Sequence, residues 1–334
     1  MKKILMLMAA MSFCSLLFAQ TKVGTTAANF LTIPVGPRAS AMGSAFLAVA
    51  NDATTAYWNP GGLSRLSRNE FTASFSEWLV NTKINWFGVA FKFDENNAIA
   101  ISINQLDYGQ EEITTAEQPN GTGARWDAVD LAVGVSYSRN LTDRFSIGAT
   151  GKYITQRIWN ESASAFALDI GLLFYTQLEG LQLGMNISNF GTELKLDGKD
   201  LLQSIDVDPS NAGNNANIAG GLNTESWPLP LTFSVGLAYD AINSEDWVLT
   251  LASDAVIPNN QSTYGNFGGE ITWNKIISLR GGLNSVGKEA AEEGYTVGAG
   301  VQYDFGGFFA KIDYSYSDFG IFKQIQRFAI SVGL

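Results

Sequence analysis

Large apolar side chains at every second position are the feature that most constrains how this chain can fold. Between residues 129 and 137, the odd positions carry Val129, Leu131, Val133, Val135 and Tyr137. The positions between them carry Asp130, Ala132, Gly134 and Ser136. Because successive side chains of a β-strand point to opposite faces, this pattern predicts a strand with one large apolar face and one small or polar face.

The same alternation recurs along most of the chain after residue 69. We place fourteen strands at 70–78, 83–93, 97–107, 127–138, 144–155, 164–175, 181–190, 230–239, 246–256, 264–273, 277–286, 294–304, 307–316 and 325–334. Ten residues at roughly 3.3 Å each and a tilt near 45° rise about 23 Å, close to the apolar band of about 25 Å in an outer-membrane barrel. Beyond the N-terminal segment, no apolar run approaches roughly 18 residues, so no transmembrane helix is expected. The predicted fold class is all-β, a transmembrane antiparallel β-barrel of about fourteen strands.

The connections between these segments alternate in length. Every second one is short and polar, as at 94–96, while the others include long insertions at 108–125 and 191–229. Short periplasmic turns that alternate with longer outer loops are typical of bacterial barrels, and an even number of strands places both barrel ends in the periplasm. Aromatic residues near strand ends, such as Trp78 and Trp247, agree with the interfacial girdles of such barrels.

A soluble β-sandwich or propeller would also show alternation. Such a fold buries its large residues and leaves no room for charges between two packed sheets. Here the alternation places Asp169, Glu270 and Arg280 on the inner side. We interpret these three as lumen charges that neutralise one another in a wet interior. The alternative, a carboxylate pair for acid–base catalysis, is disfavoured.

The N-terminal segment predicts export. It begins with two lysines, residues 4–18 are almost wholly apolar, and Ala19 offers a small residue for cleavage. This is the pattern of a secretory signal peptide over residues 1–19. An apolar run of about 15 residues is short for a membrane anchor, and a lipoprotein signal at Cys14 is disfavoured because a bulky residue precedes it. Together with the strand pattern, the signal predicts the cell outer membrane as the location.

Residue counts argue against several classes of function. The one cysteine lies in the signal peptide and histidine is absent, which argues against thiol catalysis, disulfides and the commonest metal ligands. A net charge of −11 argues against nucleic acid, because its binding depends on basic surfaces. No glycine-rich loop joins a strand to a helix, so no nucleotide site is expected. We predict that the protein is not an enzyme and holds no cofactor and no metal.

Residues 20–69, between the signal peptide and the barrel at 70–334, lack strand alternation and are rich in small residues. The stretch from Asn59 to Gly62 predicts a turn, since proline cannot continue a helix and glycine tolerates positive φ. Because an empty wide barrel would leak, we interpret this segment as a hatch in the lumen, and we expect Arg38 to pair with a lumen carboxylate. The candidate hatch residues are Arg38, Gly43, Asp52, Trp58, Asn59, Pro60 and Gly61.

Residues 37–63 read PRASAMGSAFLAVANDATTAYWNPGGL. This string resembles the opening signature of the PorV/PorQ family, which belongs to the FadL-like outer-membrane barrels; the resemblance is strongest over residues 34–66 and continues in strand count and spacing to the C-terminus. It implies a fourteen-stranded barrel with an N-terminal hatch and a part in type IX protein secretion. In that system, PorV-type members accept cargo that carries a C-terminal signal and pass it to the cell-surface attachment machinery. The chain departs from the usual pattern at Leu334, where such barrels commonly end in an aromatic residue.

The long outer loop at 191–229 is the candidate surface for a protein partner. A long insertion adds little loop-closure entropy, and loops on a rigid scaffold commonly carry function. Its apolar candidates for contact are Leu201, Leu202, Ile205 and Trp227. The alternative is that these residues only fold the loop over the barrel mouth. The loop also has oxygen ligands that suit Ca²⁺, but their spacing does not match an EF-hand loop and favours a solvated acidic loop; these are Asp197, Asp200, Asp206 and Asp208.

Two functions from different classes follow. The favoured prediction is a PorV/PorQ-type protein that takes part in type IX secretion by binding cargo or the translocon through its outer loops and hatch. The alternative is a FadL-like channel for hydrophobic small molecules, and a general diffusion porin is a third possibility. Most inward positions are small, polar or charged rather than apolar, which favours the first. The expected partners are outer-membrane lipid and secretion proteins, with neither nucleic acid nor nucleotide.

Overall fold

One closed barrel of fourteen antiparallel strands dominates the computed structural model, which describes residues 23–211, 215, 217–288 and 291–334. The barrel strands are β1 (Glu70–Glu77), β2 (Lys83–Lys92), β3 (Asn97–Glu112), β4 (Arg125–Thr142), β5 (Phe145–Ile158), β6 (Glu161–Tyr175), β7 (Leu181–Gly191), β13 (Thr232–Asn243), β14 (Trp247–Pro258), β15 (Tyr264–Trp273), β16 (Ile277–Val286), β17 (Tyr295–Asp304), β18 (Phe309–Asp318) and β19 (Gln324–Gly333). Strands adjacent in this order pair with one another, and β1 pairs with β19 to close the ring, for example at Phe75 and Phe328. The predicted fold class is confirmed, whereas the predicted signal peptide at 1–19 lies outside the described residues.

The predicted segments agree with the strands, with a marked difference at one hairpin. The segments predicted for β15 and β16 coincide with the strands, whereas β3 runs on to Glu112 and β4 begins earlier, at Arg125. The register shifts between Asp107 and Gln110, where Gly109 has a φ of 81°, and pairing resumes beyond this bulge. The extension is mostly polar, so no apolar alternation could have indicated it.

The strands place large apolar side chains outside and small or polar ones inside. On β6, Leu168 and Ile170 are each 40% exposed, while Asp169 between them is 2% exposed. The large residues face lipid because the ring presents its outer surface directly to the membrane. In the part of the chain that the structure describes, no helix is both long and apolar enough to cross a membrane.

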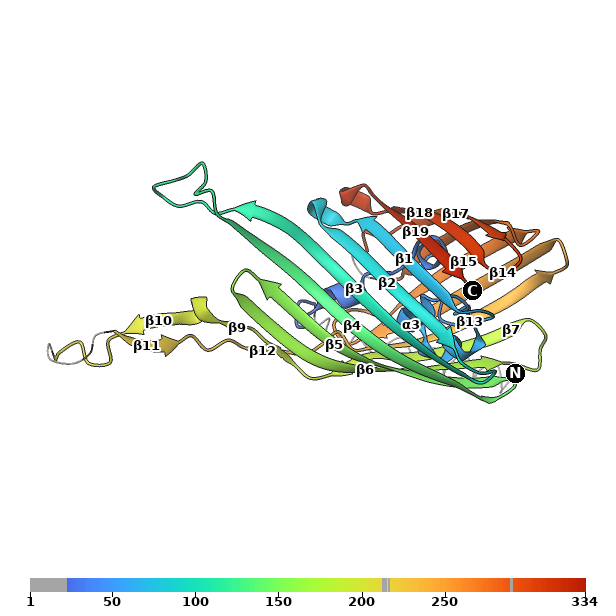
Figure 1. The fold of residues 1–334 in the computed structure, drawn as a ribbon, viewed down its shortest axis with the longest axis horizontal. Coiled ribbons are helices and arrows are strands. Elements are labelled where there is room, and N and C mark those ends of the chain that lie inside the picture. The colour runs from blue at the N-terminus through green and yellow to red at the C-terminus, as the bar shows by residue number, and fades with distance from the viewer. Residues whose placement is uncertain (1–22, 212–214, 216, 289–290) are drawn as a thin grey trace, which may run out of the picture.

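Two features project beyond one end of the barrel, and the C-terminus lies at the other end (Figure 1). One feature is the extended hairpin of β3 and β4. The other is the loop 192–231 between β7 and β13, here called the outer arm. Its elements are β8 (Leu194–Lys195), β9 (Asp197–Gly198), η5 (Lys199–Leu201), β10 (Leu202–Ile205), β11 (Ile218–Gly221) and β12 (Ser226–Trp227). In the arm, β8 pairs with β12 and β10 with β11, while β9 pairs with the start of β6. Short connections on the barrel contain η4 (Leu79–Asn81) and η6 (Gly320–Phe322).

The chain before β1, here called the pre-barrel segment (residues 23–69), fills the interior of the barrel. Its helical turns are η2 (Asn29–Thr32), α2 (Pro37–Ala41), α3 (Thr55–Trp58) and η3 (Pro60–Arg65). Residues 35–66 are mostly buried, and Met42 and Phe46 have no exposed surface. Because α2 contacts β16 to β19 while η3 contacts β2 to β6, the segment reaches both sides of the lumen.

Inward-facing glycines let the backbone of the pre-barrel segment touch the barrel wall. A methyl group added at Gly148 of β5 would lie 2.2 Å from the carbonyl oxygen of Pro60. One added at Gly268 of β15 would lie 2.1 Å from the carbonyl oxygen of Met42. A Cβ atom cannot come this close to backbone, so only glycine allows wall and segment to fit. The small inner residues therefore form a socket for the segment.

We expect Gly148→Ala to displace the pre-barrel segment and Gly151→Ala, on the same strand, to leave it in place. The methyl group at residue 148 overlaps backbone, and overpacking of this kind costs about 1–3 kcal/mol. Nothing lies within 4 Å of a methyl group at residue 151. The thermal unfolding midpoint and limited proteolysis of residues 23–69 in detergent measure the effect. Equal behaviour of the two variants would show that the segment does not pack on the wall.

Candidate functional site

A chain of ion pairs ties the pre-barrel segment to one side of the barrel. Arg38 of α2 donates from Nε and Nη2 to the two carboxylate oxygens of Glu270 on β15, at 2.9 and 2.6 Å. Its Nη1 donates to Asp52 Oδ2 at 3.0 Å and to Asn51 Oδ1 at 2.6 Å. The expected pairing of Arg38 with a lumen carboxylate is confirmed. One guanidinium thus joins two parts of the segment to each other and to the wall.

The ion pairs continue along the wall. Arg280 on β16 donates from Nε to Glu270 at 2.5 Å and from Nη1 to Asp313 on β18 at 2.7 Å. Lys311 Nζ lies 3.1 Å from Asp313 Oδ2. With the two charged residues of the segment, three cations alternate with three carboxylates, so each buried charge has a partner of opposite sign. Two of the predicted lumen charges, Glu270 and Arg280, are brought together here.

Asp52 and Arg38 stay charged although both are buried. Burial works to raise the pKa of Asp52, but the charges of Arg38 and Lys311 and the hydrogen bonds from Thr54 and Arg38 hold that pKa below its usual value of 3.8. Burial likewise works to lower the pKa of Arg38, but the negative charges of Glu270 and Asp52 hold it above its usual value. Removing one partner would leave the other as an uncompensated buried charge.

Asp169, the third predicted lumen charge, lies apart from these ion pairs on β6. Its Oδ1 accepts from the Lys152 ammonium at 2.8 Å and from the backbone N–H of Asn189 at 2.8 Å. At this point the register between β6 and β7 shifts, and Asn189 has a φ of 62°. The carboxylate therefore stabilises a β-bulge, which the spacing of the sequence does not reveal.

The Asn59-Pro60-Gly61 motif fastens the segment to β6. Asn59 is fully buried, and its Nδ2 donates to the carbonyl oxygens of Leu47 at 2.8 Å and Leu172 at 2.9 Å. Its Oδ1 accepts from the backbone N–H of Gly61 at 3.1 Å, which caps η3. Pro60 begins η3, where its missing N–H costs nothing. A methyl group at Gly61 would lie 2.8 Å from a backbone oxygen of β6.

Trp58 and Gly43 hold the segment in shape. Trp58 Nε1 donates to the carbonyl of Val35 at 3.0 Å, and its ring packs edge-on against Phe46 with the ring centres 6.3 Å apart. Gly43 has a φ of 62°, a left-handed conformation that favours glycine. Its N–H donates to Thr296 Oγ1 at 3.0 Å. All seven candidate hatch residues thus lie in the pre-barrel segment and contact either the wall or one another.

Sequence reasoning did not single out Asp254 on β14 or Thr296 on β17 for this site. Asp254 Oδ2 accepts from the backbone N–H groups of Phe46 at 2.9 Å and Leu47 at 3.0 Å. Thr296 Oγ1 donates to the carbonyl of Ala41 at 2.9 Å. The alternation marks both residues as inward, but it does not tell which inward polar groups meet the segment.

The candidate contact residues of the outer arm are divided between separate elements. Leu202 and Ile205 on β10 are 56% and 44% exposed, and Trp227 on β12 is 46% exposed. Leu201, in η5, is half-buried. At the base of the arm, Leu229 is buried in an apolar cluster that includes residues of the pre-barrel segment. The arm therefore has an anchored base and an exposed outer part.

The aspartates of the arm mostly bond within their own loop. Asp197 Oδ1 accepts from the N–H of the next residue at 2.9 Å, and Asp206 Oδ1 accepts from the N–H of Asp208 at 3.1 Å. Asp200 Oδ2 accepts from the side chain of Asn160 at 2.8 Å. Within residues 23–211, 215, 217–288 and 291–334, no group of three or more His, Cys, Asp or Glu is placed to hold a metal ion.

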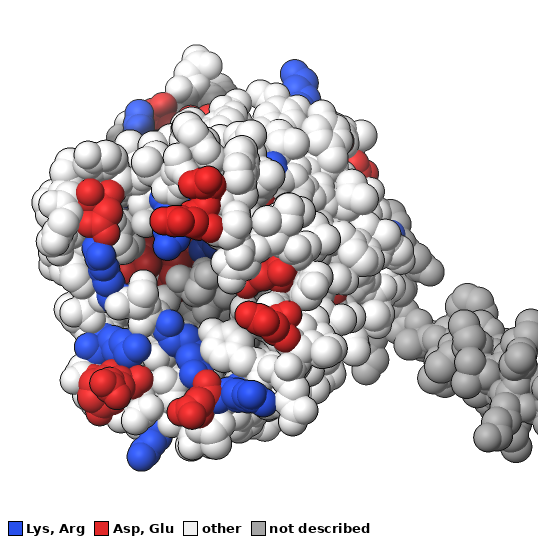
Figure 2. Space-filling model, turned by 90° about the vertical axis from the view of Figure 1, so that its right-hand side faces the viewer, with Lys and Arg blue, Asp and Glu red and all other residues white. Residues whose placement is uncertain are grey.

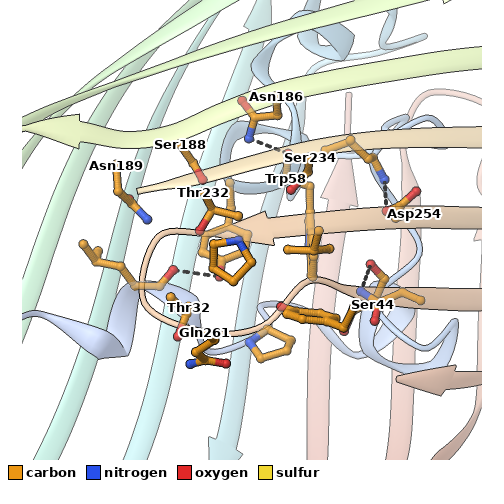
Figure 3. Close-up of a pocket in the computed structure, with 18 of the residues that line it drawn as sticks. Thr32, Ser44, Trp58, Asn186, Ser188, Asn189, Thr232, Ser234, Asp254 and Gln261 are labelled. Carbon is orange, nitrogen blue, oxygen red and sulfur yellow. Dashed lines mark hydrogen bonds between the residues drawn. The ribbon is translucent and has the colours of Figure 1, made fainter. Parts of the chain in front are cut away.

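A cavity of about 150 Å³ lies between the pre-barrel segment and the strands β5–β7 and β13–β15. Hydroxyl and amide groups from several strands point into this space around Trp58 (Figure 3). They include Ser188, Thr232, Ser234 and Gln261. The lumen beside the segment is therefore polar on much of its wall.

At the end of the barrel that carries the C-terminus, basic and acidic side chains are mixed (Figure 2). Arg65 of η3 donates to the carbonyl oxygens of Thr142 at 2.9 Å and Asp143 at 2.7 Å. Arg68 pairs with Asp304 at 2.7 Å. The pre-barrel segment is thus also tied to the turns at this end.

Comparison with known proteins gives a family and a fold. The model of a family described as type IX secretion system protein PorV matches residues 18–211, more than half of the chain. No curated protein matches. Similar solved structures include the CymD monoaromatic hydrocarbon channel (TM-score 0.57, 10% identity, 90% of this chain and 97% of that chain). Two more are the toluene transporters TodX of Pseudomonas putida (0.55, 13%, 90% and 97%) and TbuX of Ralstonia pickettii (0.54, 12%, 90% and 97%). At these identities the likeness shows the fold alone, a FadL-like barrel of the outer membrane.

We expect Arg38→Ala to destabilise the protein far more than Arg68→Ala. Loss of Arg38 leaves the buried carboxylates of Glu270 and Asp52 without their shared cation, which costs about 3–5 kcal/mol. The pair of Arg68 with Asp304 is more than a third exposed on both sides, so its loss costs less than about 1 kcal/mol. Thermal unfolding and single-channel conductance of the two variants check this. Equal stability would contradict a structural role for the buried pair.

Acidification should weaken the same contact through Asp52. Because its pKa in the folded protein lies below 3.8, its carboxylate contributes stability above the unfolded pKa, and this contribution is lost as the pH falls through the lower folded pKa. Unfolding midpoints measured from neutral pH down to acid should therefore fall less in Asp52→Asn than in the unchanged chain. The same pH dependence in both proteins would exclude Asp52 as a contributor.

Proposed function

Because the chain belongs to the PorV family of type IX secretion system proteins, we propose that it serves protein secretion by binding cargo or the translocon. The contacts are made by the outer loops and by the pre-barrel segment. The family match carries this proposal, since it covers the whole pre-barrel segment and the first seven barrel strands. The partners are then outer-membrane lipid on the barrel surface and secretion proteins at the outer face.

The pre-barrel segment acts in this proposal as a hatch that keeps the barrel closed. It is held on one side by Arg38 and Glu270 and on another by Asn59 at β6. Glycine–backbone contacts leave little space between segment and wall. A barrel filled in this way is suited to presenting surfaces to other proteins rather than to conducting large molecules.

The outer arm supplies the main surface for a partner. It projects beyond the barrel (Figure 1), its base is anchored at Leu229, and its β10 residues Leu202 and Ile205 are exposed. An anchored base with exposed apolar side chains beyond it suits the capture of another polypeptide. Trp227 would contribute near the base, where aromatic side chains often anchor interfaces.

No chemical step is assigned to the lumen charges. The family and fold are those of secretion and transport barrels. Glu270 and Asp313 each bond to Arg280, and Asp169 bonds to Lys152. Carboxylates held by cations in this way are poor proton acceptors. We therefore propose that the protein is not an enzyme.

A channel for hydrophobic small molecules is the second candidate, because similar structures include a monoaromatic hydrocarbon channel and toluene transporters. The lumen of this chain supports it less well. The cavity beside Trp58 is lined largely by hydroxyl, amide and charged groups, which a hydrocarbon would leave without hydrogen bonds.

Removal of the distal arm tests the proposal. Replacing residues 202–221 by a short Gly-Ser linker should leave a folded barrel but lower the surface display of cargo that carries a C-terminal signal several-fold. The matched control shortens the β3–β4 tip at 113–124, which leaves the arm intact. The surface and secreted proteomes of both strains, and of a deletion strain, are compared by mass spectrometry. Normal cargo display in the deletion strain, with impaired uptake of a hydrophobic compound, would instead support the channel.

A further inference from the structure

Three acceptor oxygens at the lumen cavity have no hydrogen-bond donor among the described residues. They are the Oδ1 atoms of Asn186 on β7, Asp254 on β14 and Asn260 in the connection after β14. The three residues are 6%, 4% and 3% exposed. A buried acceptor without a donor costs about 1–3 kcal/mol, and such groups are rare in folded proteins. Three of them around one cavity therefore point to a missing donor.

Neighbouring bonds fix which atom of each side chain is left over. Asn186 Nδ2 donates to the carbonyl of Trp58 at 3.1 Å, so turning this amide over would set its oxygen against another acceptor. Asn260 Nδ2 donates to Thr26 Oγ1 at 2.7 Å, and that hydroxyl already donates its own hydrogen elsewhere. Asp254 uses Oδ2 for two backbone N–H groups and keeps Oδ1 free. All three residues thus present an acceptor.

The charges around the cavity leave one carboxylate without a cation. Lys152 is paired with Asp169, and Lys288 lies over an aromatic ring, 5.4 Å from its centre. Within the described residues Asp254 makes no ion pair, since its bonds are to backbone N–H groups. With Glu293, three carboxylates and two lysines line the cavity. The lining therefore carries one formal negative charge in excess.

Aromatic rings complete the lining. Tyr57, Trp58 and Tyr264 border the cavity, and aromatic faces attract organic cations. A volume of about 150 Å³ holds several water molecules or one small organic molecule. A hydrocarbon would leave the three acceptors unpaired, and a neutral alcohol would leave the charge of Asp254 unpaired. A small protonated amine supplies both donors and charge.

We propose that the lumen cavity binds a small protonated amine, which donates to Asp254, Asn186 and Asn260. Small rotations of the three side chains turn their buried oxygens toward the ammonium group. Because Asp254 also holds the backbone of Phe46 and Leu47, the bound amine joins the wall to the pre-barrel segment. The site lies inside the barrel and is independent of any contact that the outer arm makes with secretion proteins.

Calorimetric titration of the detergent-solubilised full chain with ethanolamine at neutral pH tests the proposal. Ethylene glycol, which has nearly the same shape but no charge, and toluene are the comparison probes. We expect ethanolamine to bind at least about tenfold more tightly than ethylene glycol, and toluene not to compete with it. Equal affinity for ethanolamine and ethylene glycol, or displacement of ethanolamine by toluene, would overturn the proposal.

Matched carboxylate variants locate the binding. Asp254→Asn keeps an oxygen for the two backbone N–H groups but removes the charge, and it should weaken ethanolamine binding at least about tenfold. Asp130→Asn removes another buried carboxylate, on β4, that does not line this cavity, and it should bind as the unchanged chain does. If Asp254→Asn fails to assemble, Asn260→Ala replaces it and should weaken binding several-fold. Unchanged binding in the cavity variant would also overturn the proposal.

Discussion

A membrane offers no water to its backbone, and this constraint governs the whole structure. Every N–H and C=O group within the lipid must be paired inside the protein, so a chain that crosses with strands must close them into a ring. Here the pairing of β1 with β19 achieves the closure. Once the ring is closed, large side chains can face lipid and the polar residues have only the lumen left. Arg280, with a side chain 1% exposed, is accommodated because the lumen also holds Glu270 and Asp313.

The interior is organised by close approach as much as by charge. Glycines such as Gly148 and Gly268 bring strand backbone against the backbone of the pre-barrel segment, while Arg38 and Asn59 fix its position by hydrogen bonds. Buried ion pairs contribute little net stability compared with apolar packing of the same volume, but losing one partner is costly. The network around Arg38 therefore does more to define where the segment lies than to stabilise the barrel.

The likeness to hydrocarbon channels and toluene transporters extends to the fold, not to the chemistry of the lumen. A FadL-like barrel can host different functions because function resides in the residues that the scaffold positions. In this chain those residues are the hydroxyl, amide and charged groups around Asp254 and the exposed side chains of the outer arm. Both differ from a lumen that would favour a hydrocarbon, which agrees with membership of a secretion family.

The sequence by itself determined the ring, because period-two alternation is a local property that each strand carries independently: β15 and β16 begin and end where the pattern predicted. It also indicated which residues face inward, among them Glu270 and Arg280. It could not show that these two share a network with Arg38 and Asp52, or that Asp254 holds the backbone of Phe46. Such contacts join residues about 200 or more positions apart, and only the closed ring, with the segment seated inside it, brings them together.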